Sequence, residues 1–168
     1  MLADADGEVT RGIEVVEFAS GAPRLLAGAH SDNVGGGIDN WNLRQPLGVV
    51  AGVTPFNFPV MVPMWMFPLA LVCGNSFILK PSERDPSAAL LIADLLKQAG
   101  LPDGVLNVVT GYGQTTGEAL ALHEDVDKIS FTGSIATARK LLQNSAVSNL
   151  KRLSLELGGK SPNIVFPD

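Results

Sequence analysis

The sequence of 168 residues is poor in cysteine and in basic residues, and these shortages exclude several classes of protein. The single cysteine, Cys73, cannot form an internal disulfide, so nothing points to an oxidising compartment. Because 12 basic residues face 17 acidic ones, the net charge of −5 argues against nucleic acid or an anionic membrane as a partner. The N-terminus is acidic where a targeting peptide would be basic, so we expect a cytoplasmic protein.

Long apolar runs are also lacking. The most apolar stretch, residues 60–72, contains Pro63 and Pro68 and is shorter than the roughly 18 to 20 residues that span a bilayer. It predicts a buried helix. The two histidines, His30 and His123, are expected at the surface, and no clustered ligands suggest a metal. A hydrophobic content of 46% with 17% charged residues fits one globular core.

From residue 48 onward, short apolar runs alternate with helical patterns. This alternation predicts an α/β protein with a parallel sheet and helices on both faces. Strands are expected at residues 48–53, 75–80, 105–109, 128–132, 152–157 and 163–166, and helices at 60–72, 87–99, 135–146 and from the glycine-rich 111–117 through about 123.

The first forty residues follow another pattern. Asp6 is a candidate cap for a helix over residues 9–20, although Gly12 weakens that prediction. Residues 31–37 include three consecutive glycines and are expected to interrupt regular structure before Trp41.

Polar residues follow three of the expected strands, and each admits a functional and a structural interpretation. Asn57 stands at the carboxyl end of a strand, where its amide could donate to an oxyanion or simply close an Asx-turn. Lys80 and Glu83 could bracket a ribose or belong to a solvated turn. Glu156 lies between two leucines, which would desolvate it as a general base, but it could equally point outward from an edge strand.

Four segments in this order resemble the aldehyde dehydrogenase superfamily over residues 44–167: Pro-Phe-Asn-Phe-Pro at 55–59, Leu-Lys-Pro-Ser-Glu at 79–83, Phe-Thr-Gly-Ser at 131–134 and Leu-Glu-Leu-Gly-Gly-Lys-Ser-Pro at 155–162. The resemblance implies a Rossmann-like fold of the aldehyde dehydrogenase type, truncated at both ends. Residues 1–43 would then form a helix and part of an oligomerisation hairpin, and residues 44–168 the NAD-binding domain. The catalytic domain would lie outside this chain. The full-length protein would be a homodimer or a homotetramer.

The resemblance also implies NAD as cofactor, although no Gly-x-Gly-x-x-Gly fingerprint occurs in a strand-to-helix turn. Lys80 and Glu83 would hold the adenosine ribose, and Glu83 would repel the 2′-phosphate of NADP. The remaining positions that it assigns to the cofactor are Thr54, Phe56, Arg84, Gly113, Gly117, Phe131 and Ser134. Ala138 replaces a glycine that is common in the family, which leaves the pose of the pyrophosphate open.

The family's chemistry is covalent: a cysteine thiolate attacks a small-molecule aldehyde, hydride passes to NAD and water releases the acid. By resemblance, Asn57 stabilises the oxyanion and Glu156 activates the water. Cys73 is expected to be a buried structural thiol, so the nucleophile would come from outside the chain, which would be inactive alone. This predicts an NAD-dependent oxidation of an aldehyde, possibly a semialdehyde, to its acid.

Two other functions stay open. Residues 44–86 resemble methylmalonate-semialdehyde dehydrogenases, which transfer the acyl group to coenzyme A and lack a carboxylate at the position of Glu156, whereas the sequence from Lys128 onward resembles the hydrolytic enzymes. Because Glu156 is present, we rank water first and CoA second as the acceptor of the acyl group. A non-catalytic nucleotide-binding or assembly module is the remaining alternative.

Overall fold

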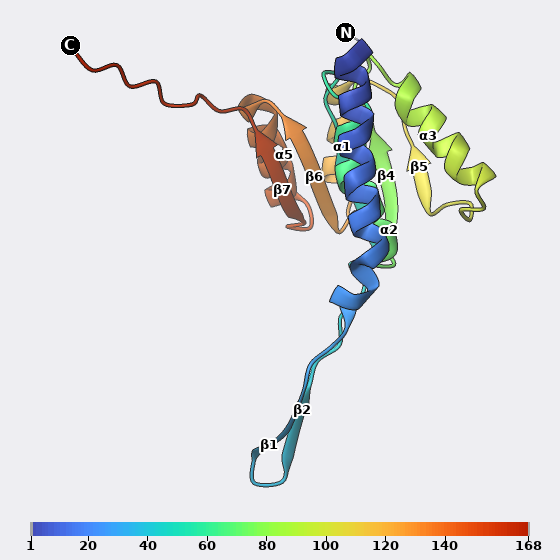
Figure 1. Ribbon diagram of the computed structural model, residues 1–168, viewed down its shortest axis with the longest axis vertical. Coiled ribbons are helices and arrows are strands. Elements are labelled where there is room, and N and C mark those ends of the chain that lie inside the picture. Colours follow the sequence, from blue (N-terminus) through green and yellow to red (C-terminus); the bar gives the residue numbers. More distant parts are fainter. Residues whose placement is uncertain (1, 168) are drawn as a thin grey trace.

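The computed structural model describes residues 2–167 and shows a five-stranded parallel sheet between two layers of helices (Figure 1). The elements in chain order are α1 (Leu2–Gly21), η1 (Ala22–Leu26), β1 (His30–Gly35), β2 (Ile38–Trp41), β3 (Val49–Val53), α2 (Met61–Val72), β4 (Ser76–Lys80), α3 (Ser87–Gln98), β5 (Leu106–Val108), η2 (Gly113–Gly117), α4 (Glu118–Leu122), β6 (Lys128–Gly133), α5 (Ile135–Val147) and β7 (Arg152–Leu157). The α/β fold class predicted from the sequence is confirmed.

The strand order in the sheet is β5-β4-β3-β6-β7, so β3 lies at its centre. Strands β4 and β5 lie on one side of β3. The chain then crosses back over β3, and β6 and β7 lie on the other side. In register, Val53 pairs with Lys80 of β4 and with Phe131 of β6. The strand order therefore reverses between β3 and β6, which makes this position the topological switch point of the sheet. Open α/β sheets bind ligands at such a point, at the carboxyl ends of the strands.

Each face of the sheet carries its own core. On one face Val50, Phe77 and Leu79 pack against Phe67 of α2 and Ala89 of α3. On the other face Ala51, Val53, Ile129 and Phe131 pack against Ala121 of α4 and Ala138 and Leu141 of α5. Strand residues alternate between the two faces, so adjacent residues of β3 serve different cores. The expected apolar face of α3 is only partly used, because Leu90, Leu91 and Leu95 are exposed.

The N-terminal helix α1 lies against α2, outside the helix layer that covers the sheet (Figure 1). Gly12 permits the close approach, since a Cβ at this position would lie 2.6 Å from the Sδ atom of Met64. The glycine that weakened the helix prediction therefore marks the contact between two helices. Asp6 lies inside α1 and does not cap it, because the helix already begins at Leu2; the start predicted from the sequence was wrong.

Two further expectations were wrong. Residues 31–37 do not interrupt regular structure: β1 and β2 form an antiparallel hairpin, in which His30 pairs with Trp41, and it extends away from the sheet (Figure 1). Residues 163–166 form no strand; the chain after β7 runs as an extended segment without regular structure. Among residues 2–167, no helix is long and apolar enough to cross a membrane.

Candidate functional site

The strand ends that carry the candidate residues meet at one edge of the sheet. The backbone amide of Thr54, just after β3, donates to the carbonyl of Lys80 at the end of β4 (3.2 Å). On the other side of β3, Val53 pairs with Phe131, which is followed within β6 by Thr132 and Gly133. The predicted segments 54–59, 80–84 and 131–134 therefore lie beside the topological switch point.

Asn57 and Glu156 line the same cavity, of about 350 Å³, together with Trp65 of α2 and Thr132 of β6. Asn57 belongs to the turn between β3 and α2, and Glu156 is the partner of Thr132 across the β6–β7 pair. An amide donor and a carboxylate acceptor thus face one space, the arrangement needed to stabilise an oxyanion and to take a proton from water. Glu156 is exposed, however, so its leucine neighbours do not supply the desolvation expected from the sequence.

Lys80 and Glu83 form a linked pair after β4. The Lys80 side chain is 3% exposed, and its ammonium donates to the Pro81 carbonyl (3.0 Å) and to Oε2 of Glu83 (3.4 Å). Hydrogen bonding by its own backbone amide holds the pKa of Glu83 below its usual range, with a further contribution from the Lys80 ammonium and against the effect of burial. The Glu83 side chain remains 40% exposed, so a charged acceptor is presented to solvent.

Arg84 and Phe56 are brought together by the same edge of the sheet. The guanidinium carbon of Arg84 lies 4.7 Å from the centre of the Phe56 ring, a cation–π contact that joins the two loops after β3 and β4. Phe56 is half exposed.

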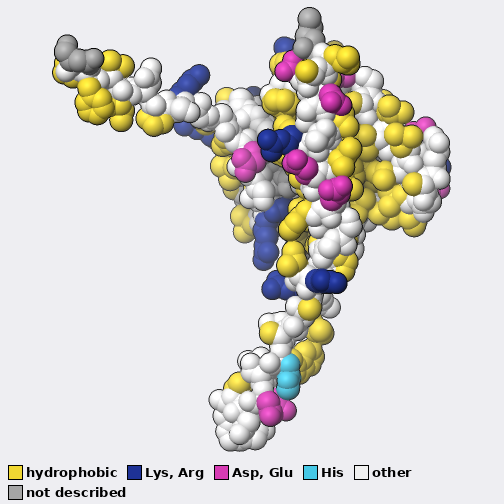
Figure 2. All heavy atoms as spheres, viewed as in Figure 1, with side chains coloured by type: hydrophobic (Ala, Val, Ile, Leu, Met, Phe, Trp, Pro, Cys, Tyr) yellow, Lys and Arg dark blue, Asp and Glu magenta, His cyan; other side chains and the backbone are white. Residues whose placement is uncertain are grey.

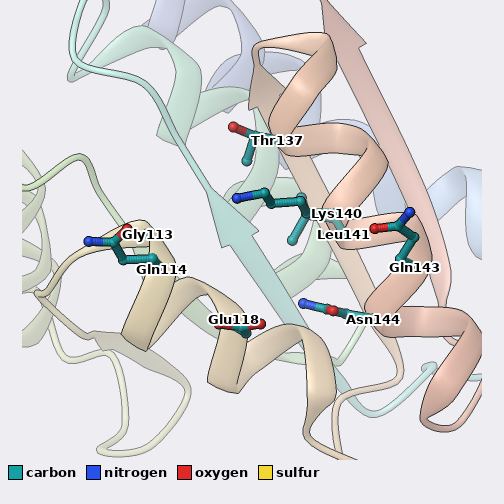
Figure 3. A pocket seen from close by; sticks show the side chains of 8 residues that line it. All are labelled: Gly113, Gln114, Glu118, Thr137, Lys140, Leu141, Gln143 and Asn144. Atoms are coloured by element: carbon teal, nitrogen blue, oxygen red, sulfur yellow. The ribbon is translucent and has the colours of Figure 1, made fainter.

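A second cavity, of about 460 Å³, lies between η2 and α4 on one side and α5 on the other (Figure 3). Gly113 and Gln114 border it from η2, Glu118 from α4, and Thr137 and Lys140 from α5. The close-up shows Lys140 and Thr137 directed from α5 toward the side chains of Gln114 and Glu118.

Ser134 is placed at the start of α5. Its Oγ accepts a hydrogen bond from the backbone amide of Thr137 (3.2 Å), so it is the N-cap of the helix. Gly117 and Phe131 are buried, and the Phe131 side chain belongs to the core between the sheet, α4 and α5. Phe131 can therefore reach a ligand at this edge only through its backbone.

Two buried hydroxyls lack partners, and only one was singled out from the sequence. Among the described residues, the Oγ1 atoms of Thr54 and Thr132 are buried without a hydrogen bond. An unsatisfied buried hydroxyl costs about 1 to 3 kcal/mol, so each of these two needs a partner such as a water molecule or a ligand. Thr132 lies in the Phe-Thr-Gly-Ser segment, but no role of its own was predicted from the sequence; its pairing with Glu156, visible only in the structure, distinguishes it.

Cys73 lies at the opposite end of α2 from Asn57. It follows the last residue of α2, whereas Asn57 precedes the first, and a helix of 12 residues is about 18 Å long. The expected burial was wrong in degree, since the thiol is only half-buried. Within residues 2–167, no three His, Cys, Asp or Glu side chains gather where they could hold a metal ion.

A family model described as "Aldehyde dehydrogenase family" matches residues 1–168. Among curated relatives, malonate-semialdehyde dehydrogenase 1 of Geobacillus kaustophilus is 53% identical over 165 residues, which cover 98% of this chain and 33% of the relative. The mitochondrial methylmalonate-semialdehyde dehydrogenase [acylating] of Arabidopsis thaliana is 47% identical over 167 residues, covering 99% of this chain and 27% of that protein. The chain thus spans about a third of the length of these relatives.

Solved structures give the same result. The methylmalonate-semialdehyde dehydrogenase of Oceanimonas doudoroffii superposes with a TM-score of 0.87 at 58% identity, covering 92% of this chain and 31% of the other. The indole-3-acetaldehyde dehydrogenase of P. syringae, solved with NAD⁺, gives a TM-score of 0.87 at 46% identity, with coverage of 95% and 32%. At these identities, the likeness extends to sequence as well as fold.

Proposed function

Since this chain belongs to the aldehyde dehydrogenase family, we propose that it is the NAD-binding part of an enzyme that oxidises an aldehyde to its carboxylic acid. The observation that carries the proposal is the shared cavity of Asn57 and Glu156 beside the topological switch point. Residues 1–43 would form the N-terminal helix and oligomerisation hairpin, and residues 44–168 the cofactor domain. By the names of its relatives, the substrate is a semialdehyde such as malonate or methylmalonate semialdehyde.

The residues at the strand ends fit NAD. Glu83 presents an ionised acceptor that suits the hydroxyls of the adenosine ribose, and the buried Lys80 ammonium, which donates to Glu83, would supply its remaining proton to them. The cavity between η2, α4 and α5 accommodates the adenine, and the amides at the start of α5 favour the pyrophosphate. The unpartnered hydroxyl of Thr54 lies farther along the same edge, where the nicotinamide end would follow. When bound, NAD accepts a hydride from the substrate.

Asn57 and Glu156 would divide the remaining chemistry. The Asn57 amide donates a hydrogen bond to the oxygen that gains negative charge when a thiolate adds to the aldehyde. After loss of hydride to the cofactor has turned this adduct into a thioester, Glu156 would accept a proton from the attacking water, so that the acid and the free thiolate are released. Thr132, in the same cavity, has a free hydroxyl with which to hold that water.

The nucleophilic thiol would come from outside these 168 residues. Cys73 lies beyond the far end of α2 from Asn57, at about the length of that helix. It therefore cannot attack an aldehyde whose oxygen is held by Asn57. We expect the isolated chain to bind NAD without oxidising aldehydes.

CoA-dependent acyl transfer is the second candidate, and a specific observation favours it: the Arabidopsis thaliana relative, 47% identical, is named as acylating. Glu156 favours water, because water is a much weaker acid than a thiol and therefore depends more on a general base to become a nucleophile. In the full-length enzyme, identifying the product distinguishes hydrolysis from CoA-dependent acyl transfer. Acid formation without CoA supports hydrolysis, and strict dependence on CoA would reverse the ranking.

Oligomerisation follows the same resemblance. The β1–β2 hairpin extends from the body and exposes Val34, Ile38 and Trp41, apolar side chains that a second subunit would cover in a homodimer or homotetramer.

The proposal is tested on the purified 168-residue chain. Isothermal titration with NAD is expected to show binding of one equivalent, and an absorbance assay with malonate semialdehyde is expected to show no NADH. Lack of NAD binding by a folded chain would contradict the cofactor assignment. Turnover that survives Cys73→Ser would show that the chemistry does not need an external cysteine.

A further inference from the structure

The helix that follows the Asn57 turn is capped by a residue from another helix. The N-cap residue of α2, Val60, offers no side-chain oxygen to the first amides. Instead Oε1 of Glu8, in α1, accepts hydrogen bonds from the backbone amides of Val60 (2.7 Å) and Met61 (3.0 Å). A carboxylate at a helix N-terminus makes charge-assisted bonds and interacts favourably with the helix dipole. Glu8 thus fixes the start of α2 across 52 residues of sequence.

Glu8 differs from the other acids of its helix. Asp4, Asp6, Glu14 and Glu17 are exposed, and Figure 2 shows acidic side chains gathered over the outer surface of α1. Glu8 is half-buried between α1 and α2. Burial of a charged side chain is costly unless it is hydrogen-bonded, so the two amide bonds account for its position.

The turn between β3 and α2 depends on these contacts for its shape. At one end, the amide of Thr54 is tied to Lys80; in the middle, Phe56 contacts the Arg84 guanidinium; at the other end, Glu8 holds Val60 and Met61. Within the described residues the Asn57 side chain itself makes no hydrogen bond. Asn57 is exposed and its amide is unbonded, so the backbone of the turn fixes the direction of its Cα–Cβ bond and with it the range of positions that the amide can reach.

We propose that Glu8 is a positioning residue: by capping α2 from α1, it fixes the turn so that the Asn57 amide donates into the cavity it shares with Glu156. This rests on the proposed function of Asn57. Without the cap, the first turn of α2 frays and the amide samples other directions, so fewer molecules are poised to stabilise the oxyanion. Thr54 and Phe56, the cofactor positions in this turn, are held separately by Lys80 and Arg84, and the other cofactor positions lie beyond the turn, so NAD binding should change little.

The test uses a full-length aldehyde dehydrogenase that contains this segment. Glu8→Ala is expected to lower kcat about 10-fold or more, since a shift of about 1 Å in a catalytic group costs up to about 100-fold. The Kd for NAD and the KM for the aldehyde should stay within about twofold. Glu8→Gln keeps the accepting oxygen and should restore most of kcat. The matched control, Glu17→Ala, removes an exposed carboxylate from the same helix and should leave kcat unchanged.

A double-mutant cycle with Asn57→Ala separates positioning from a general loss of stability. If Glu8 acts through Asn57, adding Glu8→Ala to Asn57→Ala lowers kcat no further; a further 10-fold loss would overturn the proposal. Should Glu8→Ala not fold, Glu8→Asp, which shortens the reach by one methylene, takes its place in the cycle, and an unchanged kcat in that variant also overturns the proposal. If Asn57→Ala alone retains full kcat, it is the proposed function of Asn57 that fails.

Discussion

Replacing Glu83 by glutamine tests whether the carboxylate after β4 selects NAD over NADP. The substitution keeps the shape and one accepting oxygen but removes the charge. Because hydrogen bonding by its own amide holds the pKa of Glu83 below its usual range, the carboxylate is ionised at pH 7. A 2′-phosphate on the ribose would meet this charge, and the Glu83→Gln variant would not repel it.

The size of the effect follows from the exposure of the side chain. Two unit charges about 4 Å apart interact by ~4 kcal/mol at an effective dielectric constant of about 20, but by only ~1 kcal/mol in water. Since the Glu83 side chain is 40% exposed, we take a value toward the lower limit, about 1 to 2 kcal/mol. NADP should therefore bind roughly 5 to 30 times more tightly to Glu83→Gln. NAD should bind a few times more weakly, because a neutral acceptor forms the weaker hydrogen bond.

The measurement is isothermal titration of the 168-residue chain with NAD and with NADP. Asp103→Asn is the matched control: it removes one negative charge from an exposed residue that pairs with Lys97, next to β5. The ratio of NADP to NAD affinity should rise in Glu83→Gln and stay constant in the control. An unchanged ratio in Glu83→Gln, or an equal rise in both variants, would refute the role of the carboxylate.

Two further predictions concern stability. Gly52→Ala should lower the free energy of unfolding by about 1 to 3 kcal/mol, because the new Cβ would lie 2.5 Å from Cζ of Phe77. In urea unfolding, the cost of Gly52→Ala should be smaller in a Phe77→Leu background, and an equal cost in both backgrounds would contradict this. Burial lowers the pKa of Lys151 more than Glu124 raises it, so the unfolded chain binds the proton more tightly. Stability should consequently rise with pH between the lowered folded pKa and about 10.4, and Lys151→Met should flatten this part of the profile. A slope that Lys151→Met leaves unchanged would assign the effect to other groups.

Local patterns predicted most of the sheet and its helices. The apolar runs before Asn57 and Lys80, and the helical spacing after Ser87, each appear in the structure within a residue or two of the predicted bounds. The strand predicted at residues 163–166 was wrong. An apolar run favours a strand only where a neighbouring strand offers hydrogen bonds, and none lies beside this segment in the described part of the chain. The family resemblance implied a hairpin in residues 1–43, but the local pattern did not predict its strands because residues 31–37 are rich in glycine; two of those glycines, Gly36 and Gly37, make its turn.

The candidate site was predictable only in part. Motif order named Asn57 and Glu156, and the structure places both beside one cavity. Their surroundings were not predictable: the exposure of Glu156 depends on what covers β7, and the unpartnered hydroxyl of Thr132 depends on packing between α2 and the sheet. The contact of Glu8 with the start of α2 joins residues 52 apart, and no spacing rule reaches that far.

The central position of β3 also has a consequence for how the chain folds. Val49 pairs with Ser76 of β4, which is 27 residues farther along the chain. Its amide also donates to the side chain of Asp127, just before β6, which is 78 residues farther along. The entropic cost of closing a loop grows with the logarithm of its length. The longer connection is therefore about 1 kcal/mol less favourable than the shorter one. We therefore expect β3, α2 and β4 to form the early half of the sheet, with β6 and β7 added later. The cavity of Asn57 and Glu156 joins these two halves, so the catalytic pair comes together only when folding is nearly complete.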